Sequence, residues 1–539
     1  MLPSLFLPST EQSTVIATTA IAGAALFLLH HLLWKKHPLD VLPGPPSPSF
    51  LFGHVLETKG SIMKWHATVD YPEPFLSWVK QYGGAVHYRE FLSHLVSVTD
   101  PKAIQHILVT HAANYPRGVG IRRMFEDKMF GVGLLSSTGA EHDRQRKMLN
   151  PHFSQAQVKT FVPIFLCHAR LCCDTVLAKA ADTQTPLNMS TVFQELTLAI
   201  IGRAAFGFAF DQHPQAHASY ERQQQALPIW IMLGQIFVPK FSFFPIPQLR
   251  KYQTAQRDLG HLMQTVIAEK MQKNQPMPDD DAAYDLLDLM LPSTTSDEAL
   301  VHTMTFMTVG HDTTSSALGW VFAMLATRPA IVARLRREIA VVMESHGGAL
   351  ASWDAIHELE YMTAVIQESL RFNTVVNHIM RRVAEADDHV PMADGSTIFI
   401  PKVVTLTFVS RELILAGEGT GMDVNLPALH RNPRHWANAN AFVPERFVQG
   451  TPEWIADEAL RGTKHHTFVY MPFAFGAGNC IGQKFALAEI AAITATLIRE
   501  FDFGLTKDAN TRHLFVSPIM RVANLDMTVR RVPSSGPGA

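Results

Sequence analysis

Cysteine is scarce in this chain, which has only four in 539 residues. Cys167, Cys172 and Cys173 lie close together and Cys480 stands alone. This pattern excludes a disulfide framework and suits a reducing compartment. The first three cysteines could hold a metal, but no matching histidine or cysteine pattern follows them, so we interpret them as ordinary thiols.

A surplus of one charge is also missing, because the formal net charge is −2. A nucleic-acid-binding protein needs a clustered basic face, so we expect no nucleic-acid partner. The length would allow two or three domains. No Gly/Ser-rich linker or repeat of fixed period divides the chain, however, and we predict a single domain over residues 49–539.

Charged residues are absent from Val15 to Trp34, a stretch long enough to span a bilayer as one helix. Lysines follow this stretch directly, so the positive-inside rule places the rest of the chain in the cytosol. A cleaved signal peptide is the alternative, but its charges would lie on the opposite side and no small-residue cleavage site stands out. We therefore predict a membrane anchor over residues 1–36 and a stiff Pro-rich hinge over 37–48.

The segment from Pro472 to Gly482 is an apolar, glycine-rich loop that carries Cys480 at the start of a predicted helix. Free N–H groups and the positive dipole end of a helix favour a thiolate over a thiol. We therefore expect a lowered pKa for Cys480 and a role as an anionic ligand. Gly476 and Gly482 would let the backbone approach a flat cofactor closely. A buried structural cysteine is the competing interpretation.

Three further motifs precede this loop. Glu368 and Arg371 form a Glu-x-x-Arg pair on one face of a predicted helix. The second motif, Phe442-Val-Pro-Glu-Arg-Phe447, contains Arg446, and the third, Val309-Gly-His-Asp-Thr-Thr314, lies in the middle of a helix. In this order and spacing the motifs resemble those of the haem-thiolate monooxygenases, the cytochrome P450 family, over roughly residues 43 to 529.

The resemblance implies a mainly α-helical fold with small β-sheets, a haem b (iron protoporphyrin IX) cofactor, and Cys480 as the axial iron ligand. It also implies that Phe473, Gly476 and Gly482 frame the haem. His142 and Arg146, four residues apart on one helix face, match the family's propionate-binding pair. Arg382 matches a second propionate arginine, with Arg381 as the alternative because a one-residue slip in a strand reverses its face.

One position departs from the family pattern. The family usually carries Arg or His two residues before the cysteine, and this chain has Gly478. The missing cation should weaken haem retention or shift its potential unless Arg146, Arg382 or His142 compensates. Alternatively, the loop is re-registered, because Phe475-Gly476 offers a second Phe-Gly pair.

Other residues receive roles from the same resemblance. Asp312 and Thr313 would deliver the protons that cleavage of dioxygen requires. A hydroxyl bonded back to its own helix is the alternative for Thr313. Glu368, Arg371 and Arg446 would form a buried structural triad, because buried charges persist only when they are paired.

The expected reaction inserts one oxygen atom from O2 into an apolar substrate. Electrons would come from NADPH through a separate flavoprotein reductase, with cytochrome b5 as a further donor, at the endoplasmic reticulum membrane. The apolar segment 227–247 resembles the roof of the active site, where it would dip into the membrane, and core packing is its alternative. Segments 411–425 and 449–466 are interpreted as surface insertions. The alternative functions are a peroxide-rearranging isomerase or dehydratase, and a haem-binding protein without catalysis.

Overall fold

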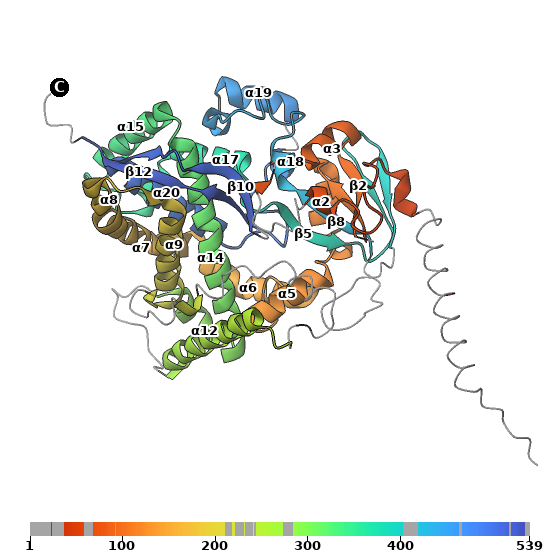
Figure 1. The fold of residues 1–539 in the computed structure, drawn as a ribbon, viewed down its shortest axis with the longest axis horizontal. Helices are drawn as coiled ribbons and strands as arrows, with labels where there is room; N and C mark the ends of the chain where they lie inside the picture. Colours follow the sequence, from red (N-terminus) through yellow and green to blue (C-terminus); the bar gives the residue numbers. More distant parts are fainter. Residues whose placement is uncertain are drawn as a thin grey trace, which may run out of the picture.

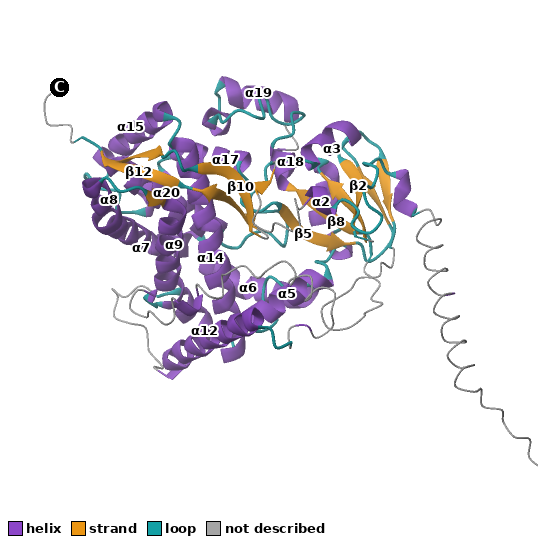
Figure 2. Ribbon diagram, in the orientation of Figure 1, coloured by secondary structure: helices purple, strands orange, loops and turns teal. Residues whose placement is uncertain are grey.

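The structure is a computed structural model that describes residues 37–58, 71–91, 93–210, 244–272, 284–402, 419–462, 466–516 and 519–533, together with 23, 68–69, 218–220, 231 and 241. It is mainly α-helical with small sheets, which confirms the predicted fold class (Figures 1 and 2). Apart from Gly23, the predicted anchor lies outside the described residues, as does most of segment 227–247.

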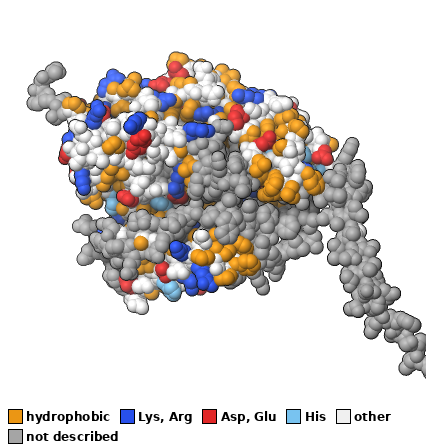
Figure 3. All heavy atoms as spheres, viewed as in Figure 1, with side chains coloured by type: hydrophobic (Ala, Val, Ile, Leu, Met, Phe, Trp, Pro, Cys, Tyr) orange, Lys and Arg blue, Asp and Glu red, His pale blue; other side chains and the backbone are white. Residues whose placement is uncertain are grey.

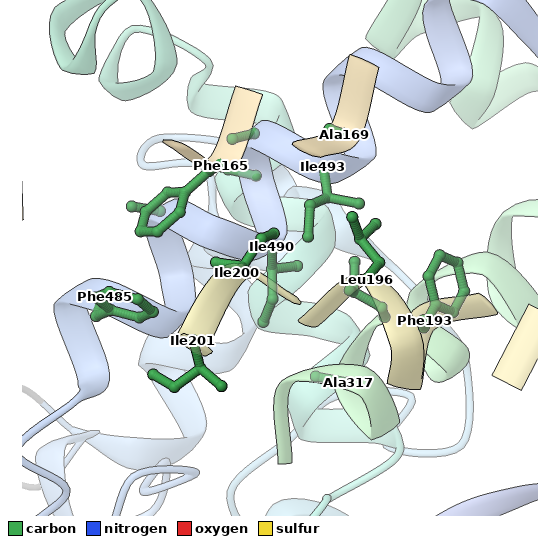
Figure 4. Close-up of a cluster of buried hydrophobic side chains, with 14 of the residues drawn as sticks. Phe165, Ala169, Phe193, Leu196, Ile200, Ile201, Ala317, Phe485, Ile490 and Ile493 are labelled. Atoms are coloured by element: carbon green, nitrogen blue, oxygen red, sulfur yellow. The ribbon is translucent and has the colours of Figure 1, made fainter. Parts of the chain in front are cut away.

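Four long helices supply the centre of the main hydrophobic core: α7 (Gln155–Cys172), α9 (Met189–Phe206), α14 (Ser296–Leu325) and α20 (Gln483–Glu500). Side chains such as Phe165, Leu196, Phe485 and Ile493 point toward one another between these helices (Figure 4). Helix α14 starts at a capping box, in which Thr295 and Glu298 bond each other's backbone N–H. Because α14 is buried along most of its length, it can hold polar groups at fixed positions inside the protein.

The remaining helices vary in length. They are α2 (Val55–Thr58), α3 (Phe75–Tyr82), α4 (Pro101–Gln105), α5 (Val119–Met129), α6 (Gly139–Leu149), α8 (Ala178–Thr183), α12 (Pro247–Gln272), α13 (Leu286–Met290), α15 (Pro329–Ser345), α16 (Trp353–His357), α17 (Glu360–Phe372), α18 (Leu426–His430) and α19 (Pro452–Arg461). Single turns of other helix types are η1 (Pro38–Val41), η2 (His106–Thr110), η3 (Ala112–Asn114), η4 (Asn150–Phe153), η5 (Cys173–Leu177), η8 (Leu291–Ser293), η9 (Pro444–Phe447) and η10 (His466–Phe468).

The largest described sheet has the strand order β2 (Ala85–Glu90), β3 (Ser93–Val98), β8 (Gly421–Asn425), β5 (His378–Val383). The smaller sheets are β1 (Thr68–Val69), β10 (Asn510–Val516), β11 (Ile519–Asn524); β4 (Leu187–Asn188), β12 (Asp526–Arg531), β9 (Phe501–Leu505); and the hairpin β6 (Asp388–Pro391), β7 (Thr397–Ile400). Strand β3 pairs in parallel with β8 and antiparallel with β2.

The two predicted surface insertions need correction. Residues 411–418 lie outside the described residues, but Gly421–Asn425 forms β8, an inner strand whose five residues are all buried. The second segment contains α19, capped by the Thr451 side chain. An amphipathic helix and a short buried strand were both overlooked because polar residues in each suggested loops.

Among the described helices, only the continuous run Gln155–Thr183 is by itself long and apolar enough to cross a membrane. Helices α14 and α15 pass the same test only together, with a bend of 113° between them. Since α7 packs in the core beside α9 and α20 (Figure 1), this property is weak evidence for a membrane span.

Candidate functional site

The cysteine loop, residues 472–482, folds back on itself immediately before α20. The Cys480 N–H donates to the Phe473 carbonyl at 2.9 Å, and the Asn479 N–H donates to the Gly476 carbonyl at 3.1 Å. Helix α20 begins at Gln483, so Cys480 lies just ahead of its first turn. These bonds present the Cys480 side chain at the end of a closed backbone turn.

The prediction of a lowered pKa for the Cys480 thiol is wrong for the protein without its cofactor. Cys480 keeps exposed surface although protein atoms crowd around it on the other sides. This enclosure raises the pKa of Cys480, while the Gly482 N–H and the charge of Arg146 act in the opposite direction. The helix end therefore favours the thiolate, as expected, but desolvation has the larger effect.

The two glycines singled out in the loop have different surroundings. Gly476 has φ +77°, and an added Cβ would lie 2.2 Å from the Leu108 carbonyl oxygen. Glycine is thus required there by the approach of η2 as well as by the backbone conformation. An added Cβ on Gly482 would lie 3.9 Å from the Cys480 sulfur, so glycine leaves the thiol accessible from that side.

Cations gather beside the loop. Arg146, from α6, donates to the Asn479 carbonyl at 2.7 Å and to its side chain, which fixes α6 against the loop. His142, one turn earlier, is buried, and its Nε2 has no hydrogen-bond partner among the described atoms. Burial is the main cause that lowers the pKa of His142. The structure thus brings the two predicted α6 residues together with the loop.

The two strand arginines have different surroundings. A Cβ added to Gly478 would lie 2.8 Å from Arg382 Nη2, so Arg382 reaches the cysteine loop. Arg381 instead donates to the Glu90 carboxylate at 2.6 Å. The two arginines point in opposite directions because successive side chains along β5 lie on alternate faces of the sheet.

Arg117 is a site residue that sequence reasoning missed. Its Nη2 would lie 3.1 Å from the same added Cβ on Gly478, and Arg117 forms an isolated antiparallel bridge with Arg382. Its side chain is buried and donates to the carbonyls of Leu134 and Leu135. A charged residue placed between Pro116 and Gly118 was the signal that could have identified it.

The arginine cluster, Arg117, Arg146 and Arg382, fits an anionic cofactor. Burial lowers the pKa of Arg117 to about 10, and the neighbouring charges that act on it belong to Arg382, Arg146 and Arg122, all of the same sign. Among the described residues, no acidic side chain is a partner of the three cluster members. One buried and two half-buried cations without acidic partners favour an anion, which the two carboxylates of a porphyrin would supply.

Glu368, Arg371 and Arg446 meet as predicted, on α17 and η9. Arg371 grips the Glu368 carboxylate through two bonds of 2.7 and 2.9 Å, and Arg446 Nε lies 3.2 Å from the same carboxylate. The sequence analysis did not identify the other half of this network: Arg446 donates to Asp457 of α19 at 2.6 Å, and Arg461 lies 3.3 Å from that carboxylate. Asp457 is fully buried.

Asp312 and Thr313 lie in the middle of α14. The Asp312 carboxylate pairs with Arg521 of β11. The Thr313 hydroxyl donates to the Val309 carbonyl at 2.9 Å, which is the alternative considered for a helical threonine. His311 is buried and lies 2.9 Å from the Tyr220 hydroxyl.

The remaining cysteines bear out their interpretation. Cys172 and Cys173 are buried, and this burial raises the pKa of each thiol to about 12. A protonated core thiol is a poor metal ligand.

Comparisons with known proteins agree with this arrangement. The sequence model for cytochrome P450 matches residues 43–523. Cytochrome P450 monooxygenase 205 of Postia placenta is 25% identical over 534 residues, covering 91% of this chain and 93% of that protein. The ganoderic acid synthetase of Ganoderma lucidum is 27% identical over 545 residues, with coverages of 91% and 93%.

A solved structure extends the likeness to three dimensions. The haem domain of cytochrome P450DA superimposes with a TM-score of 0.70 and is 20% identical, covering 91% of this chain and 98% of that one. At this identity the likeness demonstrates the fold.

Proposed function

The chain belongs to the cytochrome P450 family, a family of haem-dependent monooxygenases, and we propose that it oxidises an apolar lipid-, terpenoid- or sterol-like molecule. The observation that carries the proposal is the cysteine loop with its arginine cluster. An accessible thiol near arginines that lack acidic partners, one of them buried and two half-buried, matches a cofactor that combines a metal centre with carboxylates.

We assign the haem contacts to these side chains. Cys480 would be the axial ligand, and the arginine cluster and His142 Nε2 would pair with the haem carboxylates. Phe473 and the glycines Gly476 and Gly482 would frame the cofactor. When bound, the haem supplies the centre at which O2 is activated, and the thiolate ligand raises the electron density on its iron.

Proton delivery is assigned to Asp312 and Thr313. The pairing with Arg521 orients the Asp312 carboxylate. The Thr313 hydroxyl can rotate from the Val309 carbonyl toward a ligand, because the hydroxyl rotor is the only part that must move. Together these groups would pass protons from water toward bound oxygen.

An apolar substrate is supported by the surroundings of Thr313. Val309 and Phe306 precede it by four and seven residues, so all three lie along one face of α14. The pairing of Asp312 with Arg521 removes net charge from the same region. The name of the Ganoderma relative, a ganoderic acid synthetase, is compatible with such a substrate.

Electron supply is proposed to come from a separate NADPH-dependent flavoprotein reductase, with cytochrome b5 as a further donor. An open hollow between α6 and the cysteine loop is lined by two basic residues, Arg146 and Lys147, and one acidic residue, Asp143, so it offers a net basic approach to the loop. Basic surfaces accelerate docking of acidic partners. We place the protein at the endoplasmic reticulum membrane, anchored by residues 15–34 with its catalytic domain in the cytosol.

The test combines binding and turnover. Candidate fatty acids, terpenoids and sterols are added to the purified haem protein, and the spin-state shift of the Soret band is recorded. A compound that shifts the band should then yield an oxygenated product that depends on NADPH and reductase. Conversion of an organic hydroperoxide without either, and no NADPH-dependent product, would favour the isomerase function instead.

A further inference from the structure

A second group of ligand-type side chains lies on η2 and β6, outside the haem contacts. His106 Nε2 is 2.8 Å and His111 Nδ1 is 3.4 Å from the same oxygen, Oδ2 of Asp388. The three ligand-type atoms all lie within 4.8 Å of one another. His106 is buried, Asp388 is nearly so, and the His111 side chain is 53% exposed, so the group has one open side.

An irregular turn of helix creates this group. Residues five apart in an α-helix point about 140° apart, which would separate His106 from His111. Residues His106–Thr110 instead form a π-turn, closed by the bond from the His111 N–H to the His106 carbonyl at 2.8 Å. The wider turn brings both rings to one side, with their centroids 3.9 Å apart. Such π-turns often occur at functional positions.

The carboxylate is held in place from two sides. The Tyr115 hydroxyl donates to Asp388 Oδ2 at 2.9 Å, and the His389 N–H donates to Oδ1 at 2.8 Å. Outer hydrogen bonds of this kind orient the ligands of metal sites.

We propose that His106, His111 and Asp388 form a binding site for a divalent transition-metal ion such as Zn²⁺. Two imidazoles and one carboxylate are a ligand set that zinc and related ions accept, and water would complete the coordination on the exposed side. Such an ion would tie β6 to η2. The η2 backbone contacts Gly476 at Leu108, so an ion bound here would also stabilise the side of the cysteine loop that packs on η2.

A second histidine group, His37, His87 and His94, is less suited to this role. Its ligand-type atoms also lie within 4.8 Å of one another. However, the His37 ring is stacked on His94, with planes 8° from parallel, and His87 Nε2 and His94 Nδ1 already share a hydrogen bond of 2.9 Å. Because the lone pairs of an imidazole lie in the ring plane, parallel stacked rings do not direct them to one point. This group serves as an internal comparison.

The test measures zinc retention by the full-length haem protein, prepared without a polyhistidine tag and stripped with a chelator. Equilibrium dialysis against Zn²⁺, followed by elemental analysis, gives the stoichiometry and the affinity. We expect one tightly held Zn²⁺ per chain, with affinity about tenfold to 100-fold or more weaker in His111→Gln and Asp388→Asn. His389→Gln should bind as the wild type does, because that exposed ring lies next to Asp388 but outside the group.

Each outcome either supports or contradicts the proposed metal site. The ferrous carbonyl spectrum shows that a variant has kept its haem site, and the exposed position of His111 makes His111→Gln the variant least able to disturb folding. Equal zinc affinity in wild type, His111→Gln and Asp388→Asn would overturn the proposal. Loss of zinc in His94→Gln alone would overturn it as well, since the ion would then belong to the stacked group.

Discussion

At the scale of single residues, the thiol is the first group to test. Cys480→His should abolish the red-shifted Soret band of the ferrous carbonyl complex, because imidazole donates less electron density to iron than a thiolate does. The matched control is Cys167→Ser, since Cys167 is the other exposed cysteine of the chain. The control should keep the band. An unchanged band in Cys480→His would mean that another residue ligates the iron.

Gly478 illustrates how the structure reverses an expectation from the sequence. The family pattern suggests that Gly478→Arg restores a missing cation, but the ends of Arg382 and Arg117 already occupy that space. A third guanidinium should repel both, so we expect haem transfer to apomyoglobin to be faster, by roughly tenfold for a coupling of about 1.4 kcal/mol. Gly478→Ala should have little effect, because flexible guanidinium ends can shift.

The double variant Arg117→Ala/Gly478→Arg separates charge crowding from other damage. Removal of one arginine leaves room for the new side chain and keeps the number of cations constant. Its haem loss should therefore be slower than that of Gly478→Arg alone. If it is faster, the loop has been distorted by the substitution itself and the repulsion argument is wrong.

Thr313→Ala should uncouple NADPH oxidation from product formation. Loss of the hydroxyl removes a proposed proton-transfer group, and such groups are typically worth about 10²–10⁴-fold in rate, although water can replace part of this. Hydrogen peroxide should rise and product per NADPH should fall, while the haem and its thiolate spectrum remain. Ser315→Ala is the control, because Ser315 points to another side of α14 and donates to the Asp312 carbonyl. Normal coupling in Thr313→Ala would exclude this role.

At the scale of elements, α19 is tied to the haem-side scaffold by one buried carboxylate. Asp457 joins Arg446 of η9 to Arg461 of α19, and Arg446 in turn contacts Glu368 of α17. Asp457→Ala would leave two arginines without this anion. Breaking a buried pair in this way costs about 3–5 kcal/mol, and we expect that loss in the free energy of unfolding.

Chemical denaturation of the haem protein measures this loss, with Glu453→Ala as control because Glu453 is exposed on the same helix. The control should stay within about 0.5 kcal/mol of the wild type. Equal stability of Asp457→Ala and the control would show that α19 folds and docks without its buried charge.

The same elements show what the sequence could and could not predict. Motifs with a local pattern, such as Glu368 with Arg371 and the helix of Asp312 and Thr313, were placed correctly because helical spacing fixes their geometry. Arg117 and Asp457 were missed, since the role of each depends on contacts with residues that are not its neighbours in the sequence. The thiol pKa of Cys480 was predicted in the wrong direction because desolvation in the folded protein outweighs the local helix end.

At the scale of the whole molecule, exposed apolar side chains gather near the predicted hinge. Phe50, Leu51, Phe52 and Leu56 are 39–55% exposed and follow one another within a few residues. Figure 3 shows hydrophobic side chains over the part of the surface that α2, α3 and β2 occupy in Figure 1. We name Phe50, Leu51, Phe52 and Leu56 the hinge patch. An apolar patch next to a membrane anchor is suited to contact with the bilayer surface.

Removal of residues 1–36 should therefore release much of the protein from membranes, but not all of it. The predicted span supplies most of the affinity, while the hinge patch, together with the apolar segment 227–247, retains an interfacial contact. Flotation of the truncated protein with liposomes measures the remaining bound fraction.

Within the truncated protein, Leu51→Ser/Leu56→Ser should lower that fraction further. Ile455→Ser/Leu460→Ser should not, although those side chains are similarly exposed, because they belong to α19, which packs against η9 and is not part of the hinge patch. Complete solubility of the truncated protein without detergent would rule out the interfacial contact. An equal loss of liposome binding in both double variants would show that binding depends on general hydrophobicity and not on the hinge patch.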